Sequence, residues 1–240
     1  MSTTTPVLTL LILMLIGGCA KEEARPEQEP PPNAPTRIVF LGDSITEAGA
    51  QPGGYVALVA DSLKQRFPTR SIEVIGAGIS GNKVPDLQAR LERDVLAHEP
   101  THVVIYIGIN DVWHFYEFDQ VTGTERDVFE QGLRDLIAKM QEAGADVLLC
   151  TPSVIGEDPG SDTPVNQRLI DYAEVSRTVA STSGAHLCDL RAAFEAHLQT
   201  HNPDNAYEGI LTSDGVHLNE AGNRFVASFI VDHLRPLLTP

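Results

Sequence analysis

Residues 37–46 read RIVFLGDSIT, in which four consecutive apolar residues run directly into Gly-Asp-Ser. A short, continuous apolar run rich in branched side chains is typical of a strand that is buried on both faces. Gly-Asp-Ser is typical of a turn, and Asp or Ser at such a point commonly caps the start of a helix. The segment therefore predicts a strand, a sharp turn and a helix, with Ser44 at the junction.

The rest of the chain repeats this alternation of short apolar runs and longer amphipathic ones. The predicted strands are 37–41, 72–75, 103–107, 146–150 and 186–188. The predicted helices are 54–66, 84–97, 125–143, 164–183 and 219–238, and Gly144 is expected to end the third of them. Strands that alternate with helices form a parallel sheet covered on both faces. The predicted fold class is therefore α/β, a three-layer α/β/α sandwich around a five-stranded, mostly parallel sheet.

Polar segments that contain glycine occupy the places where such a sheet builds its sites. Residues 42–44 (GDS), 76–82 (GAGISGN) and 108–111 (GIND) each follow a predicted strand, and 213–217 (SDGVH) precede the last helix. In open parallel sheets, ligands bind beyond the carboxyl ends of the strands. We therefore expect these segments to meet at one edge of the sheet.

These segments resemble the four sequence blocks of the SGNH (GDSL-like) hydrolases and occur in the order of that family. The matching residues are GDSIT at 42–46, GISGN at 78–82, GIND at 108–111 and DGVH at 214–217. The resemblance covers nearly all of residues 36–240 and implies a flavodoxin-like SGNH hydrolase domain. It implies Ser44 as the nucleophile, with Asp214 and His217 completing a catalytic triad.

The residue types fit acyl transfer. A serine hydroxyl is a weak nucleophile at neutral pH and needs a base within hydrogen-bond reach. The imidazole of His217 can take the proton of Ser44, and Asp214 can fix the tautomer of that imidazole. The oxyanion that forms at an ester carbonyl needs donors already in place, for which we expect the N–H groups of Ser44 and Gly81 and the amide of Asn110. The structural alternatives are a helix cap at Ser44 and turn residues at Gly81 and Asn110.

An aromatic cluster, VWHFY at 112–116, follows the third block. Packing against a loop is the commoner fate of such residues. The sharper hypothesis is a binding wall, in which Trp113 or Tyr116 stacks on a sugar ring or flanks an acyl chain. Asn82 and the segment 155–164 are further candidates for the border of the cleft.

The expected function is hydrolysis of carboxylic esters through an acyl-serine intermediate, without a metal or another cofactor, foremost the O-deacetylation of glycans. The alternatives are a lysophospholipase or arylesterase, and a catalytically silent glycan-binding protein on the same scaffold. The expected partner is a small-molecule or glycan ester. The net charge of −16, from 17 Lys and Arg against 33 Asp and Glu, repels phosphate backbones and argues against nucleic acid as a partner. The sequence leaves the oligomeric state open.

The amino-terminal segment predicts export. Residues 7–16 form an apolar run interrupted by one threonine, too short to span a bilayer, and it leads into IGGC, which resembles a bacterial lipobox with Cys19 as the acylated residue. Residues 1–6 lack the Lys or Arg with which export signals usually begin. The expected parts are a signal peptide at 1–19, a Pro- and Glu-rich linker at 20–35 and the hydrolase domain at 36–240. The expected location is that of an exported lipoprotein that touches a membrane only through its anchor.

The two remaining cysteines, Cys150 and Cys188, each lie in a predicted strand. In an exported protein a disulfide between them is permitted. Two buried free thiols are the favoured interpretation, because the sequence does not show that the side chains converge.

Overall fold

The computed structural model describes Met1 and residues 35–117, 122–158 and 160–239. The predictions for Cys19, for the signal peptide and for nearly all of the linker concern residues outside these ranges. Within them, five strands form one parallel sheet in the order β2-β1-β3-β4-β5. The strands are β1 (Thr36–Gly42), β2 (Ile72–Gly78), β3 (His102–Tyr106), β4 (Asp146–Cys150) and β5 (His186–Cys188). This order is that of flavodoxin-like folds, so the predicted fold class is confirmed.

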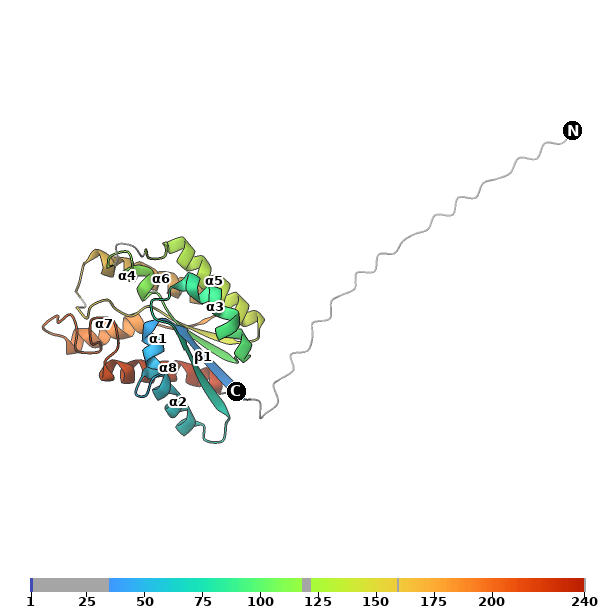
Figure 1. The fold of residues 1–240 in the computed structure, drawn as a ribbon, viewed down its shortest axis with the longest axis horizontal. Helices are drawn as coiled ribbons and strands as arrows, with labels where there is room; N and C mark the ends of the chain where they lie inside the picture. Colours follow the sequence, from blue (N-terminus) through green and yellow to red (C-terminus); the bar gives the residue numbers. More distant parts are fainter. Residues whose placement is uncertain (2–34, 118–121, 159, 240) are drawn as a thin grey trace. The chain divides into compact units, whose positions relative to one another are not determined.

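Helices cover both faces of the sheet, with α2 and α8 on one face and α3, α5 and α6 on the other (Figure 1). The helices of the described residues are α1 (Ser44–Gly49), α2 (Tyr55–Arg66), α3 (Val84–Asp94), α4 (Ile109–Trp113), α5 (Arg126–Glu142), α6 (Pro164–Ser183), α7 (Leu190–His201) and α8 (Glu220–Leu238), together with the 3-10 helix η1 (Leu96–His98). The result is the predicted three-layer sandwich.

The burial of the strands explains their composition. Residues 38–41 of β1 and 103–105 of β3 are completely buried, because helices pack on both sides of these central strands. Full burial of one such side chain contributes about 1.5–3 kcal/mol. The edge strand β2 is only partly buried, and it accordingly mixes glycine and glutamate with valine and isoleucine.

Two helices, α4 and α7, were not predicted from the sequence, whereas the helix predicted to begin at Ser44 is α1. Helix α7 buries Leu190, Phe194 and Leu198 at a spacing of four residues, and Asp189 caps it by accepting a hydrogen bond from the Ala192 N–H at 3.2 Å. That spacing is a helical signal that the sequence analysis overlooked. The helix α4 has five residues, too few to show a period of its own.

Among the smaller details, the end of one helix differs from the prediction and the end of another agrees with it. The helix predicted at 84–97 ends at Asp94, because the backbone of Val95 leaves the helical region with a φ of −128°. Gly144 follows α5 with a φ of +86°, as expected for a residue that ends a helix. Cys150 and Cys188 are in-register neighbours on β4 and β5, and both are buried free thiols.

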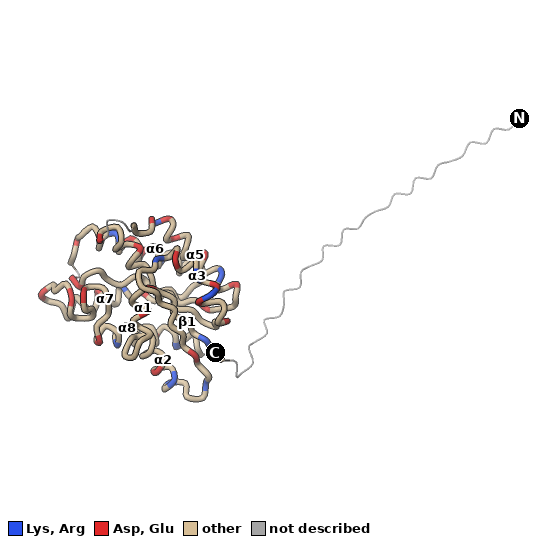
Figure 2. The backbone as a smooth tube through the Cα atoms, viewed as in Figure 1, with Lys and Arg blue, Asp and Glu red and all other residues tan. Residues whose placement is uncertain are grey.

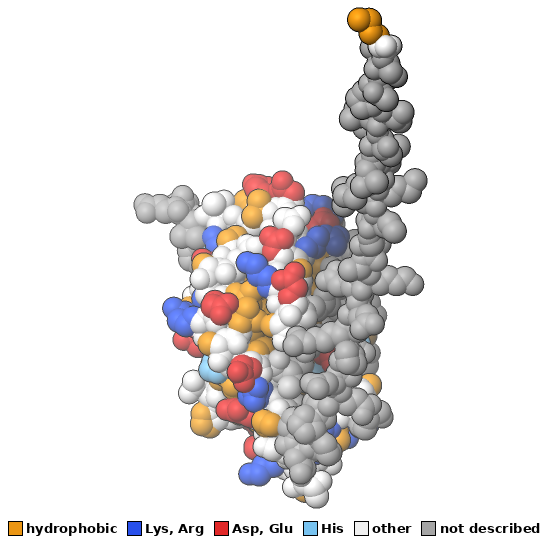
Figure 3. Space-filling view, turned by 90° about the vertical axis from the view of Figure 1, so that its right-hand side faces the viewer, with side chains coloured by type: hydrophobic (Ala, Val, Ile, Leu, Met, Phe, Trp, Pro, Cys, Tyr) orange, Lys and Arg blue, Asp and Glu red, His pale blue; other side chains and the backbone are white. Residues whose placement is uncertain are grey.

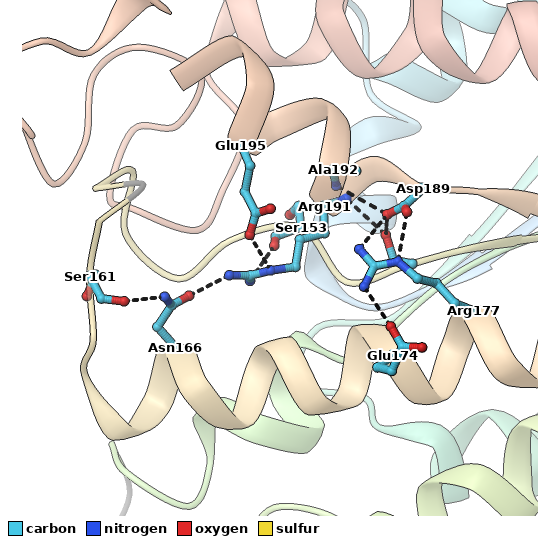
Figure 4. Close-up of polar contacts among 10 residues, drawn as sticks. Ser153, Ser161, Asn166, Glu174, Arg177, Asp189, Arg191, Ala192 and Glu195 are labelled. Atoms are coloured by element: carbon cyan, nitrogen blue, oxygen red, sulfur yellow. Dashed lines mark hydrogen bonds and ion pairs between the residues drawn. The ribbon is translucent and has the colours of Figure 1, made fainter. Parts of the chain in front are cut away.

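The segment that follows β4 is fixed between α6 and α7 by one buried arginine (Figure 4). Arg191 donates to the Ser153 carbonyl at 3.1 Å and to the Asn166 side-chain oxygen at 2.7 Å. Its Nε lies 2.8 Å from the Glu195 carboxylate. The Asn166 amide in turn donates to the Ser161 carbonyl at 2.6 Å. These bonds tie the loop that begins at residue 151 to two helices at once.

The two ends of the domain lie at the same edge of the sheet, where β1 begins (Figure 1). The Arg70 guanidinium donates to the Thr36 hydroxyl at 3.1 Å and to the Leu238 carbonyl. The chain thus enters and ends at the amino edge, opposite the loops that follow the strands.

The surface of the domain is acidic overall but mixed in detail. Figure 2 shows Asp and Glu spread over the helices and loops, with Lys and Arg between them. On the face drawn in Figure 3, side chains of both signs alternate with small apolar areas. Among the described helices, none is sufficiently long and apolar to cross a bilayer.

Candidate active site

The loops that follow three neighbouring strands form part of the candidate site. The strand β1 lies between β2 and β3, with Gly42 in register with Gly78 on one side and Tyr106 on the other. The loops that follow these strands therefore leave the same edge of the sheet side by side. Ser44 follows the middle strand, Gly81 follows β2 and Asn110 follows β3, so the topology brings together the three predicted oxyanion donors.

Ser44 stands at the first position of α1. The Asp43 carboxylate caps this helix by accepting from the Ile45 N–H at 3.0 Å, and the Asp43 carbonyl accepts from the Glu47 N–H at 2.9 Å. These bonds turn the chain sharply from strand into helix. The Ser44 hydroxyl then lies 2.9 Å from Nε2 of His217.

His217 and Asp214 lie on one short loop, which an antiparallel bridge between Thr212 and Leu218 closes. Nδ1 of His217 lies 2.7 Å from the Asp214 carboxylate. The other oxygen of that carboxylate accepts from the backbone N–H groups of His217 at 2.7 Å and Val216 at 3.0 Å. One aspartate thus orients both the ring and the backbone of the histidine.

The charge state of Asp214 fixes the tautomer of the ring. Partial burial raises the pKa of Asp214, but the hydrogen bonds from His217 and Val216 outweigh burial and hold this pKa below its ordinary value. An ionised carboxylate only accepts hydrogen bonds, so the neutral ring carries its proton on Nδ1. Its Nε2 lone pair therefore faces the Ser44 hydroxyl.

Two of the predicted donors, Gly81 and Asn110, are each held in a defined conformation. Gly81 has a φ of +76°, a left-handed conformation that side chains rarely adopt. Asn110 is 4% exposed and donates one amide hydrogen to the Asn82 carbonyl at 3.1 Å. A side-chain amide has two hydrogens. The bond to Asn82 uses one of them and fixes the direction of the amide.

The three predicted substrate-binding side chains have different surroundings in the structure. The side-chain oxygen of Asn82 accepts from Nε of Arg90 at 2.7 Å, which ties this residue to α3. Trp113 is partly buried and packs against the hydrophobic core, which is the packing alternative. Tyr116 is 43% exposed, and its hydroxyl donates to the Pro164 carbonyl at 3.2 Å. Of the two aromatic candidates, Tyr116 is thus the one on the surface.

A buried acid that was not predicted from the sequence lies against the loop that carries Asp214 and His217. Glu157 is completely buried, and its carboxylate accepts from the backbone N–H groups of Ile210 at 2.7 Å, Leu211 at 2.6 Å and Thr212 at 2.6 Å. It also accepts from the Thr212 hydroxyl at 3.0 Å. Four donors thus satisfy the oxygens of this buried carboxyl group. The segment 155–164 therefore supports the loop that carries Asp214 and His217.

Tyr207 is a second residue that the sequence analysis missed. It is 55% exposed, and its ring lies on Gly215, where an added Cβ would be 2.4 Å from Cε1. Partial burial raises its pKa, and the charges of Glu117 and Asp214 raise it further. An aromatic ring therefore lies on the outer side of the loop that carries Asp214.

Burial raises the pKa of Asp43 from 3.8 to about 7, and the nearby Asp111 carboxylate adds to the rise against the opposing hydrogen bond from the Ile45 N–H. Between pH 4 and 7 the folded protein therefore binds a proton at Asp43 that the unfolded chain has released. Since the folded state binds more protons, its free energy of unfolding falls as the pH rises through this window.

Replacing Asp43 by asparagine is expected to remove this fall. Asparagine caps helices as well as aspartate does, so the variant keeps the acceptor for the Ile45 N–H and loses the buried charge. Relative to the wild type, it is expected to gain on the order of 4 kcal/mol of unfolding free energy between pH 4 and pH 8. Urea unfolding of both proteins at several pH values measures this difference.

Asp189 provides the control of opposite sign. It also caps a helix, and partial burial raises its pKa, but the ion pair with Arg177 outweighs burial and lowers the pKa overall. Asp189→Asn is therefore expected to lose stability relative to the wild type as the pH rises from 3. A gain in both variants, or in neither, would contradict the burial argument for Asp43.

A serine, a histidine and an aspartate joined by two hydrogen bonds, at the carboxyl edge of an open α/β sheet, define a serine hydrolase. Residues 40–225 match the profile of the GDSL-like Lipase/Acylhydrolase family. The chain belongs to this family, and it is an enzyme that hydrolyses ester bonds.

Several relatives are similar over most of the chain. The acetylxylan esterase of Geobacillus stearothermophilus is 35% identical over 204 residues, which cover 80% of this chain and 90% of that one. The crystal structure of the acetyl xylan esterase AlAXEase superposes with a TM-score of 0.78 at 43% identity, covering 82% of this chain and 98% of that one. The isoamyl acetate-hydrolyzing esterase 1 homolog of Rattus norvegicus is 27% identical over 218 residues, 84% of this chain and 81% of that one.

Among the described residues, no group of three or more His, Cys, Asp or Glu side chains is placed to hold a metal ion.

Proposed function

We propose that Ser44, His217 and Asp214 carry out the hydrolysis through an acyl-serine intermediate. Nε2 of His217 takes the hydroxyl proton while Oγ of Ser44 attacks the ester carbonyl carbon. The bond to the alcohol oxygen then breaks, and His217 returns the proton to the leaving alcohol. Water adds to the acyl-serine by the same route and releases the carboxylic acid. The 2.9 Å approach of the hydroxyl to a ring nitrogen whose tautomer is fixed supports this sequence of steps.

The negative charge that forms on the carbonyl oxygen needs donors that do not have to reorganise. We propose the N–H groups of Ser44 and Gly81 and the second amide hydrogen of Asn110. Their support is the adjacency of the three loops and the bond from Asn110 to the Asn82 carbonyl.

We propose that the substrate is an O-acetylated glycan. Two groups of relatives carry acetate esters in their names, acetylated xylan in one and isoamyl acetate in the other. They differ in the alcohol and share the acetyl group. The acetylxylan esterases are the more similar group, at 35% and 43% identity against 27%, so a sugar is favoured as the alcohol.

A comparison of five kinds of ester tests the sugar and the acetyl group of this proposal separately. We expect kcat/KM for acetylated xylo-oligosaccharides to exceed that for isoamyl acetate by at least about tenfold, because a sugar offers more contacts to the rim. We expect butyryl esters of the same oligosaccharides to be poorer than the acetyl esters. Ser44→Ala provides the background rate. A preference for lysophosphatidylcholine over all of them would replace the glycan by a phospholipid, and a preference for aryl or isoamyl acetate would retain only the acetyl group.

We also propose that the chain is an exported lipoprotein, with a signal peptide at 1–19, an acylated Cys19 and a linker at 20–35. The apolar run at 7–16 and the IGGC that follows it support this. Metabolic labelling with an alkyne-tagged palmitate is expected to label the wild type and not Cys19→Ser. The matched control is Cys150→Ser, which removes a buried free thiol and keeps the label. Label that persists in Cys19→Ser argues for an ordinary signal peptide cleaved nearby.

A further inference from the structure

A buried guanidinium lies beneath the loops that carry the proposed oxyanion donors. Arg90 of α3 is 7% exposed. It donates to the Gly42 carbonyl at 2.8 Å, the Ala77 carbonyl at 2.9 Å and the Asn82 side-chain oxygen at 2.7 Å. The Asp94 carboxylate accepts a further bond at 3.0 Å. One side chain of α3 thus bonds to the ends of two strands and to the loop between β2 and α3.

Two of the four acceptors lie close in sequence to a proposed donor. Gly42 precedes Ser44 by two positions, at the end of β1. Asn82 follows Gly81 directly, and its backbone carbonyl holds the amide of Asn110. Arg90 is therefore connected to the Asn110 amide through the single residue Asn82, whose side chain accepts from the arginine and whose carbonyl accepts from the asparagine.

We propose that Arg90 is a positioning residue for all three oxyanion donors. This rests on the proposed acyl-serine mechanism, and nothing in it requires Arg90 to touch the substrate. A guanidinium presents five N–H groups in a rigid plane, so it can hold acceptors on separate loops at fixed mutual positions. The ammonium of lysine has no such plane and cannot reproduce the set.

The expected kinetic signature follows from this role. The donors bind the oxyanion, which exists only in the transition state and the tetrahedral intermediate. Donors displaced by a fraction of an ångström lower kcat and leave the binding of the uncharged ester almost unchanged. We expect Arg90→Lys to lower kcat by about 10- to 100-fold, with KM within about twofold of the wild type.

A transition-state mimic separates positioning from a merely structural role. The trifluoromethyl ketone 1,1,1-trifluoroacetone adds to a catalytic serine and forms a hemiketal whose oxyanion occupies the place of the ester oxyanion. Its inhibition constant should rise in Arg90→Lys by the same factor by which kcat/KM falls. A structural role alone would lower the melting temperature and leave the inhibition constant of the folded fraction unchanged.

Arg191 is the matched control. It is also buried, at 3% exposed, and it also holds a backbone carbonyl, an asparagine side chain and a carboxylate (Figure 4). Arg191 fixes the segment that carries Glu157, which supports the loop of His217 and not the oxyanion donors, so Arg191→Lys is expected to lose stability and to weaken inhibition less than Arg90→Lys does. If Arg191→Lys weakens inhibition as much as Arg90→Lys does, the inference fails.

A double-mutant cycle tests the connection through Asn110. In the Asn110→Ala background one donor is already absent, so Arg90→Lys should lower kcat by a smaller factor than it does in the wild type. Equal factors in both backgrounds overturn the coupling. Should Arg90→Lys fail to fold, Asn82→Ala replaces it, because it removes one acceptor of Arg90 and keeps the buried guanidinium; a wild-type inhibition constant there overturns the inference.

Measurements on the wild-type protein separate a failure of the acyl-serine mechanism from a failure of the positioning role of Arg90. If it neither binds the trifluoromethyl ketone nor reacts at Ser44 with a fluorophosphonate, the acyl-serine mechanism itself is wrong. If it does both while Arg90→Lys retains wild-type inhibition, the mechanism stands and the positioning role is wrong.

Discussion

Replacement of Ser44 by alanine is expected to lower kcat/KM for an acetate ester by roughly 10⁴- to 10⁶-fold. The variant lacks the only atom that can form the acyl-enzyme in the proposed mechanism, and the residual rate would come from the donors and from substrate binding alone. Ser44 is partly exposed and contributes little to the core, so the melting temperature should stay within a few degrees of the wild-type value. Steady-state kinetics and thermal unfolding measure the two effects.

The effect of Ser44→Ala should not add to that of a second change in the same hydrogen-bonded chain. Once the nucleophile is absent the base has no proton to take, so Ser44→Ala with His217→Ala should be about as slow as either single variant. The matched control is Ser80→Ala, an exposed serine on the loop after β2. A fluorophosphonate probe should label the wild type and Ser80→Ala and leave Ser44→Ala unlabelled. A wild type that resists the probe would favour the silent glycan-binding protein.

Replacement of Asp214 by asparagine is expected to lower kcat by about 10³- to 10⁴-fold. The asparagine oxygen can still accept from the backbone N–H groups of Val216 and His217, so the loop should keep its shape. Its NH₂ group then faces Nδ1 of His217, which must become an acceptor. The ring proton moves to Nε2 and points at Ser44, so the ring can no longer take the hydroxyl proton.

The loss of kcat in Asp214→Asn is expected to persist at every pH at which the protein is folded. A higher pH should not restore Asp214→Asn, because the defect is the place of a proton and not its presence. The matched control is Asp204→Asn. Asp204 is exposed and lies ten positions before Asp214, so this variant should have the kcat of the wild type. More than about a tenth of the wild-type kcat in Asp214→Asn would mean that the carboxylate is dispensable for orienting the ring.

The residues that react could be predicted from the sequence because they occur in short local patterns. Ser44 follows a buried strand directly, and His217 stands three positions after Asp214. The rule that sites form at the carboxyl ends of parallel strands places these patterns at one edge without any coordinates. The same holds for the order of strands and helices, since apolar runs and amphipathic periods are local signals.

The residues that support the site could not be predicted, because their partners are distant in sequence. Arg90 binds the carbonyl of Gly42, 48 positions away, and Glu157 binds N–H groups 53 to 55 positions away. In the sequence each is one charged residue among many. Only the folded arrangement shows that they are buried and which backbone groups they hold.

The sequence also did not show which aromatic side chains of the cluster at 112–116 are buried and which are exposed. Trp113 and Tyr116 are three positions apart, yet one packs against the core and the other is exposed. Both lie at or just beyond the end of a helix of five residues, which is too short for periodicity to assign a side to each ring.

The direction of β1 separates the point where the chain enters the domain from the reactive serine. The chain enters at Thr36, and seven residues later, after about 23 Å of strand, it reaches the turn that carries Ser44. A fusion partner or a solid support joined directly ahead of Thr36 would therefore attach at the edge of the sheet opposite Ser44 and would leave the loops that follow the strands uncovered.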